Sequence, residues 1–428
     1  MTYPTKRIAI IGAGISGMSA ALMLREENQV TLFEAESRLG GHARTIMAGK
    51  HGDQPVDTGF IIFNFENYPN LRALFERLGV SYVESNMSFG VSINNGSFEY
   101  GLHSIDALFA QRRNLLRPEF LRMVCDIFKF NSTALNLVKS KPELTIKELL
   151  TELCTGPWFR DYYLLPLSGA IWSTPSEYIL DFPAYSMVNF FYNHGLLHHS
   201  GQHKWYTVEG GSVAYVNRLK DILISRGINI RMHAPVDAVR RLPSGVELKS
   251  AGTTWEVFDE VIIATHSDDA LTILCDPTPD EENALGAIAY QSNDVVLHAD
   301  SLLMPKRKKI WASWVYSGSR DTTKNRIGMT YWMNSLQPIP KSDPHFVTLN
   351  NKKRIREELI YDQVTLRHPV YNSSVIAAQK IIEEFNGKNS TWFCGAWMKH
   401  GFHEDGLSSA MNVTHAINLR QEESLIAK

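Results

Sequence analysis

Apolar and polar positions change their period twice within the first 34 residues of the chain. A short apolar run, Ile8–Ile11, has the length and composition of a buried strand. The next segment, Met18–Arg25, is rich in Ala, Met and Leu and favours a helix. A second apolar run, Val30–Phe33, favours another strand. The pattern therefore predicts a β-α-β unit that ends at Glu34.

Further along the chain, the pattern predicts a long helical region followed by several short strands. Apolar residues recur at helical spacing over Ser104–Leu153, and an aromatic-rich region follows at Trp158–Tyr206. Another helix is predicted over Val213–Arg226. The remaining predicted elements are short strands at Asn229–Met232, Val236–Arg240, Val246–Lys249 and Val257–Ala264, β-rich alternation over Val295–Thr365, a buried strand over Ser390–Ala396 and a final helix over Gly406–Leu419.

The order of these elements indicates an α/β nucleotide-binding domain that is interrupted twice. We expect this domain to be built from residues 1–75, 207–275 and 388–428. The two insertions, 76–206 and 276–387, would form an α+β substrate domain. With 428 residues, of which 44% are hydrophobic, the chain is long enough to bury two cores.

The turn between the first predicted strand and helix has the glycine spacing of a dinucleotide-binding site. Gly12 permits a tight turn, Gly14 lets a pyrophosphate approach the backbone, and Gly17 lets helix and strand pack closely. The helix N-terminus offers N–H groups and a positive dipole end to the phosphates. Glu34, roughly 20 residues beyond the turn, can accept hydrogen bonds from ribose hydroxyls and would repel a 2′-phosphate. The residues expected to hold the dinucleotide here are Gly12, Ala13, Gly14, Ile15, Ser16, Gly17 and Glu34.

A second motif directly follows Glu34 and indicates which dinucleotide binds. The segment Glu34–Thr45 reads E-A-E-S-R-L-G-G-H-A-R-T, and it resembles the second fingerprint of the flavin amine oxidase superfamily, in which the acid is followed by R-x-G-G. A glycine pair permits a second close backbone approach, as the long FAD molecule requires near its ribityl chain. The resemblance implies a Rossmann-like FAD-binding domain of the glutathione reductase type. It also implies FAD contacts from Ala35, Arg38, Gly40, Gly41 and His42.

The resemblance places further FAD contacts in four later segments. The loop Asp57–Asn64 would contribute Gly59, Phe60 and Ile61, and the start of a strand at Val236 would hold adenine. The strand that ends at Ala264 resembles a family motif in which His266 replaces a glycine. The C-terminal block would contribute Gly395, Trp397, Gly406, Leu407 and Ala410, with the N–H groups of Gly406 and Leu407 facing the flavin pyrimidine edge.

Cysteine positions bear on the compartment, on metals and on how FAD is attached. Cys125, Cys154, Cys275 and Cys394 are scattered and form no C-x-x-C motif, which favours a reducing cytoplasm and no structural metal. Some relatives attach FAD through a cysteine just before the last helix, whereas Cys394 lies in the preceding strand. We therefore expect FAD to be bound non-covalently.

Charge and hydropathy restrict the possible partners. A net charge of −2 argues against a nucleic-acid partner. No apolar run reaches 18 residues, so no membrane-spanning helix is expected, and the first predicted strand begins too early for a signal peptide. The basic run Lys306–Lys309 is typical of a solvated turn, but it could also meet an anionic head group or an acyl carrier, so peripheral contact with the inner membrane surface stays open. The sequence sets neither the oligomeric state nor the electron acceptor.

The segments between the motifs are apolar and aromatic, which predicts a hydrophobic cleft over the flavin. Amine oxidases tend to place a lysine near flavin N5, but the corresponding segment, Asn293–Asp300, contains none. His298 and His403 are the titratable candidates for handling a proton, and a purely structural role is the alternative for both.

A narrower resemblance points to a lipid substrate. The segments Trp205–Ser212, Leu303–Arg307, Trp311–Trp314 and Thr330–Asn334 are similar to flavoprotein modules fused to plant cyclopropane-fatty-acid synthases. The resemblance implies hydride removal from a fatty-acyl chain, with oxidation of a small amine as the alternative. A flavin-stabilised binding or scaffold subunit without turnover is a third hypothesis, from a different class.

Overall fold

The computed structural model describes residues 5–172, 179–197, 203–318, 328–351 and 353–426. The predicted aromatic-rich region at 158–206 therefore includes residues 173–178 and 198–202, which lie outside the described residues. The predicted β-rich segment at 295–365 likewise includes residues 319–327 and 352, which also lie outside them.

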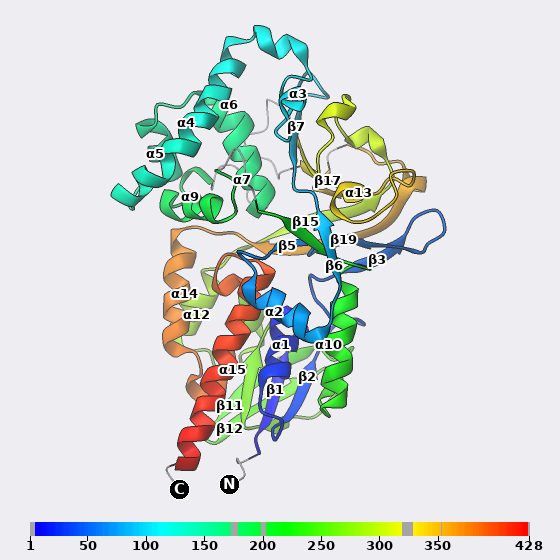
Figure 1. Cartoon of the computed structure of the whole chain (residues 1–428). Coiled ribbons are helices and arrows are strands. Elements are labelled where there is room, and N and C mark those ends of the chain that lie inside the picture. The colour runs from blue at the N-terminus through cyan, green and yellow to red at the C-terminus, as the bar shows by residue number, and fades with distance from the viewer. Residues whose placement is uncertain (1–4, 173–178, 198–202, 319–327, 352, 427–428) are drawn as a thin grey trace.

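A five-stranded parallel sheet forms the centre of the nucleotide-binding half (Figure 1). Its order is β10 (Asn229–Arg231), β2 (Gln29–Phe33), β1 (Arg7–Ile11), β14 (Glu260–Ile263) and β20 (Thr391–Phe393). In β1, Ile8 and Ile10 face one hydrophobic core, while Ala9 and Ile11 face another. Because successive side chains alternate between faces, a strand that is covered on both sides must be apolar throughout, as the Ile8–Ile11 run is.

Different layers cover the two faces of this sheet. One face packs against four helices: α1 (Ile15–Met23), α2 (Pro69–Leu78), α10 (Val213–Ser225) and α15 (His403–Ile426). The other face packs against an antiparallel sheet of β11 (Val236–Leu242), β12 (Gly245–Ser250) and β13 (Glu256–Phe258), and against α11 (Ser267–Ile273), α12 (Pro279–Gly286) and α14 (Ser373–Phe385). The strands of the parallel sheet thus come from three separated stretches of sequence.

Both insertions contribute to a single seven-stranded sheet. Its order is β19 (Ile360–Pro369), β15 (Tyr290–His298), β18 (Phe346–Leu349), β17 (Gly328–Trp332), β16 (Trp314–Gly318), β7 (Phe89–Ile93) and β8 (Phe98–Gly101). Neighbouring strands are antiparallel except β16 and β7, which are parallel and join the two insertions.

A group of helices lies beside this sheet, at the end of the molecule far from the marked termini (Figure 1). It comprises α3 (Ile105–Leu108), η1 (Arg112–Leu116), α4 (Pro118–Ser140), α5 (Ile146–Glu152), α6 (Pro157–Phe159), η2 (Arg160–Leu164), α7 (Leu165–Trp172) and α9 (Ala184–Asn193). The described part of the predicted helical region at 104–153 is therefore helical, as expected. No helix in the described part of the chain is long and apolar enough to cross a membrane.

Two short sheets connect the halves. One pairs β3 (Thr45–Ala48) with β4 (Gln54–Asp57), and the other has the order β5 (Ile62–Asn64), β9 (Trp205–Val208) and β6 (Tyr82–Ser85). In the second sheet, β5 lies before the boundary predicted at 75–76 and β6 lies after it, while β9 spans the boundary predicted at 206–207. The domain boundaries themselves stay a prediction.

Two of the differences between the observed and the predicted elements matter for the fold and the site. The strand predicted over 257–264 is two strands, β13 and β14, because the chain passes from the antiparallel to the parallel sheet at Asp259. There the Asp259 backbone N–H donates to the Arg7 carbonyl at 2.8 Å. The last helix begins at His403 rather than Gly406, which changes the site described next.

Candidate active site

A cavity of about 450 Å³ lies between the parallel sheet and the seven-stranded sheet. Its nucleotide side is lined by the glycine turn after β1, by Glu34 at the end of β2, and by residues 41–42, 58–62, 264–266 and 395–397. Residues 400–403, around the start of α15, line the cavity as well. Its opposite side is lined by residues of β15–β19 and of helices α7 and α9. The carboxyl ends of the parallel strands thus open into one hollow, where ligands of open α/β sheets bind.

The glycine turn has the geometry that a phosphate site requires. Gly12 has a φ of +98°, and a Cβ on it would lie 2.9 Å from the Ala264 carbonyl oxygen. A Cβ on Gly17 would lie 1.9 Å from the Gly12 carbonyl oxygen, so only glycine lets α1 pack here. At the start of α1, Gly14 provides no side-chain cap, so the first N–H groups of the helix are available to an anion.

The glycine pair packs directly against this turn. The Gly40 N–H donates to the Ala13 carbonyl at 2.8 Å. A Cβ on Gly41 would lie 3.1 Å from the Gly14 Cα. Gly41 lines the cavity, whereas Gly40 lies behind it. The two motifs, separated by more than twenty residues in sequence, form one continuous backbone surface.

Glu34 is held at the rim of this surface by backbone hydrogen bonds. Its carboxylate accepts hydrogen bonds from the Ala13 N–H at 2.8 Å and from the Glu36 N–H at 2.9 Å. Both bonds fix the Glu34 side chain in the cavity wall, within reach of a ribose that would lie next to the phosphates. The available N–H groups, the close backbone approach and this acid together fit FAD, which when bound supplies the hydride acceptor.

Most of the residues predicted to bind FAD line the cavity. They are Gly12, Ala13, Gly14, Ile15, Ser16, Glu34, Gly41, His42, Gly59, Phe60, Ile61, Ala264, Gly395 and Trp397. Others lie outside the lining, namely Gly17, Ala35, Arg38, Gly40, Val236, Gly406, Leu407 and Ala410. Among these, Gly17 and Gly40 shape the backbone, and Arg38 donates to the Ala43 carbonyl at 3.3 Å and pairs with Glu36 at 3.0 Å.

The structure contradicts the expectation that the N–H groups of Gly406 and Leu407 face the flavin. The Gly406 N–H already donates to the Phe402 carbonyl at 3.1 Å, and Leu407 and Ala410 are fully buried in the core. The helix begins one turn earlier because the Asp405 carboxylate accepts the Phe402 N–H at 3.0 Å, as the third-position acid of a capping box does. Residues 400–403 therefore line the cavity instead of Gly406 and Leu407.

Six histidines line the cavity in the described part of the chain, and four of them, His42, His266, His368 and His403, are held in the neutral form at neutral pH. His42 lies 5.6 Å from His266 and 5.4 Å from His368, measured between ring centroids. Burial lowers the pKa of His42. Burial, and to a smaller extent repulsion from His42 once that ring is protonated in acid, lowers the pKa of His266, His368 and His403 to about 3. At neutral pH these rings can therefore accept or donate single hydrogen bonds but carry no charge.

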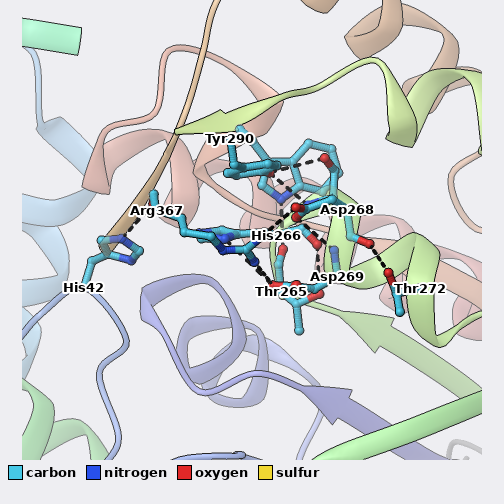
Figure 2. Close-up of polar contacts among 10 residues, drawn as sticks. His42, Thr265, His266, Asp268, Asp269, Thr272, Tyr290 and Arg367 are labelled. Atoms are coloured by element: carbon cyan, nitrogen blue, oxygen red, sulfur yellow. Dashed lines mark hydrogen bonds and ion pairs between the residues drawn. The ribbon is translucent and has the colours of Figure 1, made fainter. Parts of the chain in front are cut away.

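Figure 2 shows how Arg367 connects this cluster to α11. Its guanidinium pairs with Asp268 at 2.6 Å and with Asp269 at 2.5 Å, and its carbonyl oxygen lies 3.2 Å from His42 Nε2. His266 and the two aspartates could in principle ligate a metal ion. Arg367 already pairs with both carboxylates, so its guanidinium occupies the position that a metal cation would take.

His403 and His298, the two predicted proton carriers, have different positions. His403 lines the cavity, stacks on Phe60 at 3.9 Å and lies 2.7 Å from the Tyr215 hydroxyl through Nε2. His298 is fully buried at the far end of β15, with Nε2 2.8 Å from the Thr348 hydroxyl, and it does not line the cavity. The structure does not bring His298 to the site. Its contacts are those of a structural histidine, the alternative that the sequence left open. From β15, Tyr290 and Val295 reach the cavity instead.

An aromatic wall closes the substrate side; the sequence predicts a hydrophobic cleft there but not which aromatic residues pair to form it. Phe402 stacks on Phe190 at 5.1 Å, Phe190 on His194 at 3.7 Å, and His194 on Trp205 at 6.3 Å. Across the cavity, Trp314 and Tyr331 pack edge to face at 5.2 Å. The wall joins residues from the end of α9, from β9 and from the loop at residues 399–402, which we call the C-terminal loop. Because these segments are far apart in the chain, no local sequence pattern indicates which residues meet.

Two buried side-chain polar atoms in the cavity wall have no hydrogen-bond partner among the described residues. These are Trp314 Nε1 and the Tyr371 hydroxyl. Among the residues that the structure describes, the lining contains two carboxylates, Glu34 at the expected ribose position and Asp269 paired with Arg367, and no lysine. The substrate side therefore offers aromatic faces and isolated hydrogen-bonding groups but no unpaired charge.

All four cysteines are free thiols. Cys394 is buried at the end of β20, where burial raises its pKa to about 12, and it does not line the cavity. The other three are exposed. This arrangement gives no thiolate at the expected position of the flavin.

Comparison with known proteins agrees with this geometry. Residues 15–348 match the family described as flavin containing amine oxidoreductase. Among curated relatives, protoporphyrinogen oxidase 2 of Arabidopsis thaliana is 38% identical over 77 residues, a match that spans 18% of this chain and 14% of the relative.

Solved structures share the whole fold at low identity. A structure from Exiguobacterium sp. 255-15, provisionally assigned as a protoporphyrinogen oxidase, has a TM-score of 0.70 at 17% identity and covers 98% of this chain and 100% of that one. A fatty acid isomerase from P. acnes has a TM-score of 0.66 at 13% identity (96% and 98% covered), and a putrescine oxidase mutant has 0.69 at 14% (97% and 100%). With the glycine turn, the glycine pair and Glu34 around one cavity, the chain belongs to the flavin-containing amine oxidoreductase family and is an FAD-dependent oxidoreductase.

Proposed function

We propose that this enzyme removes a hydride from the acyl chain of a fatty-acyl lipid, in the manner of a desaturase. The observation that carries the proposal is the substrate side of the cavity, which has aromatic and aliphatic walls and no unpaired carboxylate among the described lining residues. A chain of methylene groups is stabilised by burial in such a cleft, whereas an ammonium group would lose its hydration without gaining a counter-ion.

Two residues would orient the bound substrate. The hydroxyl of Tyr371 and Nε1 of Trp314 have no partners, and a single polar group of a lipid, such as a carbonyl oxygen, could accept from either. The aromatic wall of Phe402, Phe190 and His194 would pack against the acyl chain and exclude water from it. One of the structural neighbours bears the name of a fatty acid isomerase, which supports an acyl chain in a cavity of this fold.

Oxidation of a small amine is the second candidate. It is favoured by the stacked pair Phe402 and Phe190, because paired aromatic faces can pack against an amine, and by a putrescine oxidase among the structural neighbours. It is disfavoured by the missing lysine and by the pairing of Asp269 with Arg367. We also propose that FAD is held non-covalently, because Cys394 lies outside the cavity.

Mass spectrometry of lipids and polyamines from cells with and without the protein tests the proposal. We expect acyl lipids that differ by two hydrogens to change while polyamines stay constant. A change in amines with an unchanged lipid profile would favour the second candidate. A flavin that cannot be photoreduced anaerobically, or that does not reoxidise in air, would instead indicate a binding subunit without turnover.

A further inference from the structure

The exposed hydrophobic side chains of the molecule are concentrated in one short stretch. Of the eighteen large hydrophobic side chains that are exposed in the described chain, six lie between residues 102 and 128. These six, which we call the apolar patch, are Leu102, Ile105, Leu115, Leu116, Leu121 and Phe128. Scattered exposed apolar residues are normal, but such a concentration indicates an interaction surface.

The two most exposed members of the patch lie at the ends of short helices. Ile105 is 80% exposed at the start of α3, and Leu116 is 85% exposed at the end of η1. In α4, Leu121 and Phe128 are seven residues apart and so share one helix face. The opposite face of α4 is the buried one, with Phe120, Met123 and Phe130 in the core. The patch is therefore not a misplaced part of the core.

Positive charge surrounds the patch, although the whole chain has a net charge of −2. Residues 102–130 contain five arginines and lysines, and the run Lys306–Lys309 adds four more. The two segments lie side by side, because Asp106 pairs with both Arg112 and Lys309 at 2.8 Å. In addition, Arg307 pairs with the buried Glu99 at 2.7 Å. Against these nine cations stand four carboxylates: Glu99, Asp106, Glu119 and Asp126.

We propose that this face docks on the surface of an anionic phospholipid bilayer. Protruding leucine and isoleucine side chains would enter the headgroup boundary, and the surrounding guanidinium and ammonium groups would pair with lipid phosphates. A protein partner would need pockets for Ile105 and Leu116, whereas a lipid surface adapts to any protruding side chain. The helices of this face lie at the end of the molecule away from the termini and the parallel sheet (Figure 1).

The docking face is linked to the cavity through the substrate half. Helix α4 packs on α9, which supplies Phe190 to the cavity and is followed directly by His194, also in the lining. No residue of the apolar patch lines the cavity. The docking proposal does not depend on the substrate, because vesicle binding requires no turnover. If the substrate is not a lipid, the protein should still float with vesicles; if the docking surface is wrong, it should not float, whatever the substrate is.

Vesicle flotation of the FAD-loaded protein tests the proposal. We expect the protein to float with vesicles of phosphatidylcholine and phosphatidylglycerol, much less with phosphatidylcholine alone, and to be released by about 0.5 M NaCl. The double variant Ile105→Glu, Leu116→Glu should reduce binding at least about 10-fold. Replacing Arg113 and Lys308 with Ser should reduce binding to the anionic vesicles by roughly a similar factor.

The control is Ile224→Glu, which changes an exposed isoleucine of α10 in the other half of the molecule and should bind like the unchanged protein. Flavin absorbance and melting temperature verify that each variant is folded. The proposal is overturned if the protein does not float with anionic vesicles, or if the double variant binds as well as the control. It is also overturned if the patch variants abolish a dimer that forms without lipid.

Discussion

The two sides of the cavity recognise their ligands in different ways. The nucleotide side is mostly backbone, built from the glycine turn, the glycine pair and the N-terminus of α1, with the Glu34 carboxylate at the expected ribose position. The substrate side is mostly side chains, brought together from α9, β16, β17 and the C-terminal loop. A backbone surface tolerates few substitutions, whereas a wall of side chains can be exchanged to suit a new substrate.

This difference means that substitutions on the two sides should separate cofactor binding from substrate binding. Changes on the nucleotide side should remove FAD whatever the substrate is. Changes on the substrate side should leave FAD in place and alter only what it oxidises. The expected effects below run from the largest to the smallest.

Gly17→Ala should have the largest effect. Its Cβ would lie 1.9 Å from the Gly12 carbonyl oxygen, so α1 and the phosphate turn must move apart. We expect the free energy of unfolding to fall by at least about 3 kcal/mol and FAD binding to be lost. Urea unfolding and flavin absorbance measure both. Gly286→Ala is the control, because its Cβ would meet only the Leu271 side chain, at 3.6 Å, and should change little.

Glu34→Ala should weaken FAD binding by about 1.5–3 kcal/mol while the fold is retained. The carboxylate would bond to ribose, and its loss also removes an acceptor from the N–H groups of Ala13 and Glu36. Titration of the FAD-free protein with FAD measures the change. Glu36→Ala, two residues further and exposed, is the matched control, and equal affinities for the two variants would show that the acid is misassigned.

Acid should destabilise the FAD-free protein through the buried histidines. The pKa of His266, His368 and His403 is about 3 in the folded chain, below the usual value of 6.5, so the unfolded chain binds more protons between these values. Stability is therefore full above pH 6.5 and falls as the pH decreases, on the order of 2 kcal/mol per histidine at about pH 5. Replacing His368 with Asn should flatten this dependence, and an unchanged slope in urea titrations would contradict it.

Phe190→Ala should affect the substrate side alone. It removes the ring that stacks on both Phe402 and His194, and we expect a fatty-acyl ligand to bind about 1 kcal/mol more weakly, roughly 5-fold. FAD affinity should stay unchanged, as fluorescence titrations of both ligands can verify. Tyr192→Ala, an exposed position on the same helix, is the control.

His298→Ala should have the smallest effect on the chemistry. Because His298 is buried on Thr348 outside the cavity, we expect the rate of flavin reduction to change less than about 2-fold, with a loss of roughly 1–2 kcal/mol of stability. A rate loss of about 100-fold would restore the proton-transfer role that its sequence position suggested.

The backbone geometry of the nucleotide side could be predicted from the sequence because it depends on local requirements. The spacing of Gly12, Gly14 and Gly17 and the distance to Glu34 follow directly from one β-α-β unit. The start of α15 was missed, although the signal was present: Asp405 stands three residues after Phe402, as a capping acid does.

The substrate side could not be predicted because its contacts join distant segments. His194 and Phe402 are more than two hundred residues apart, and their stacking partner Phe190 is one of many aromatic residues in its region. The sequence favours His298 as a proton carrier because it is a titratable residue on the strand where amine oxidases tend to have a lysine. The strand direction, which brings Val295 and not His298 to the cavity, is a tertiary property.

Anaerobic mixing of the FAD-loaded enzyme with candidate substrates, followed by flavin absorbance, tests the central claim most directly. The claim is that the substrate side receives an apolar chain and has no counter-ion for an ammonium group. The account predicts that fatty-acyl lipids bleach the flavin while putrescine and simple monoamines do not. Rapid bleaching by a common amine, with none by acyl lipids, would contradict it.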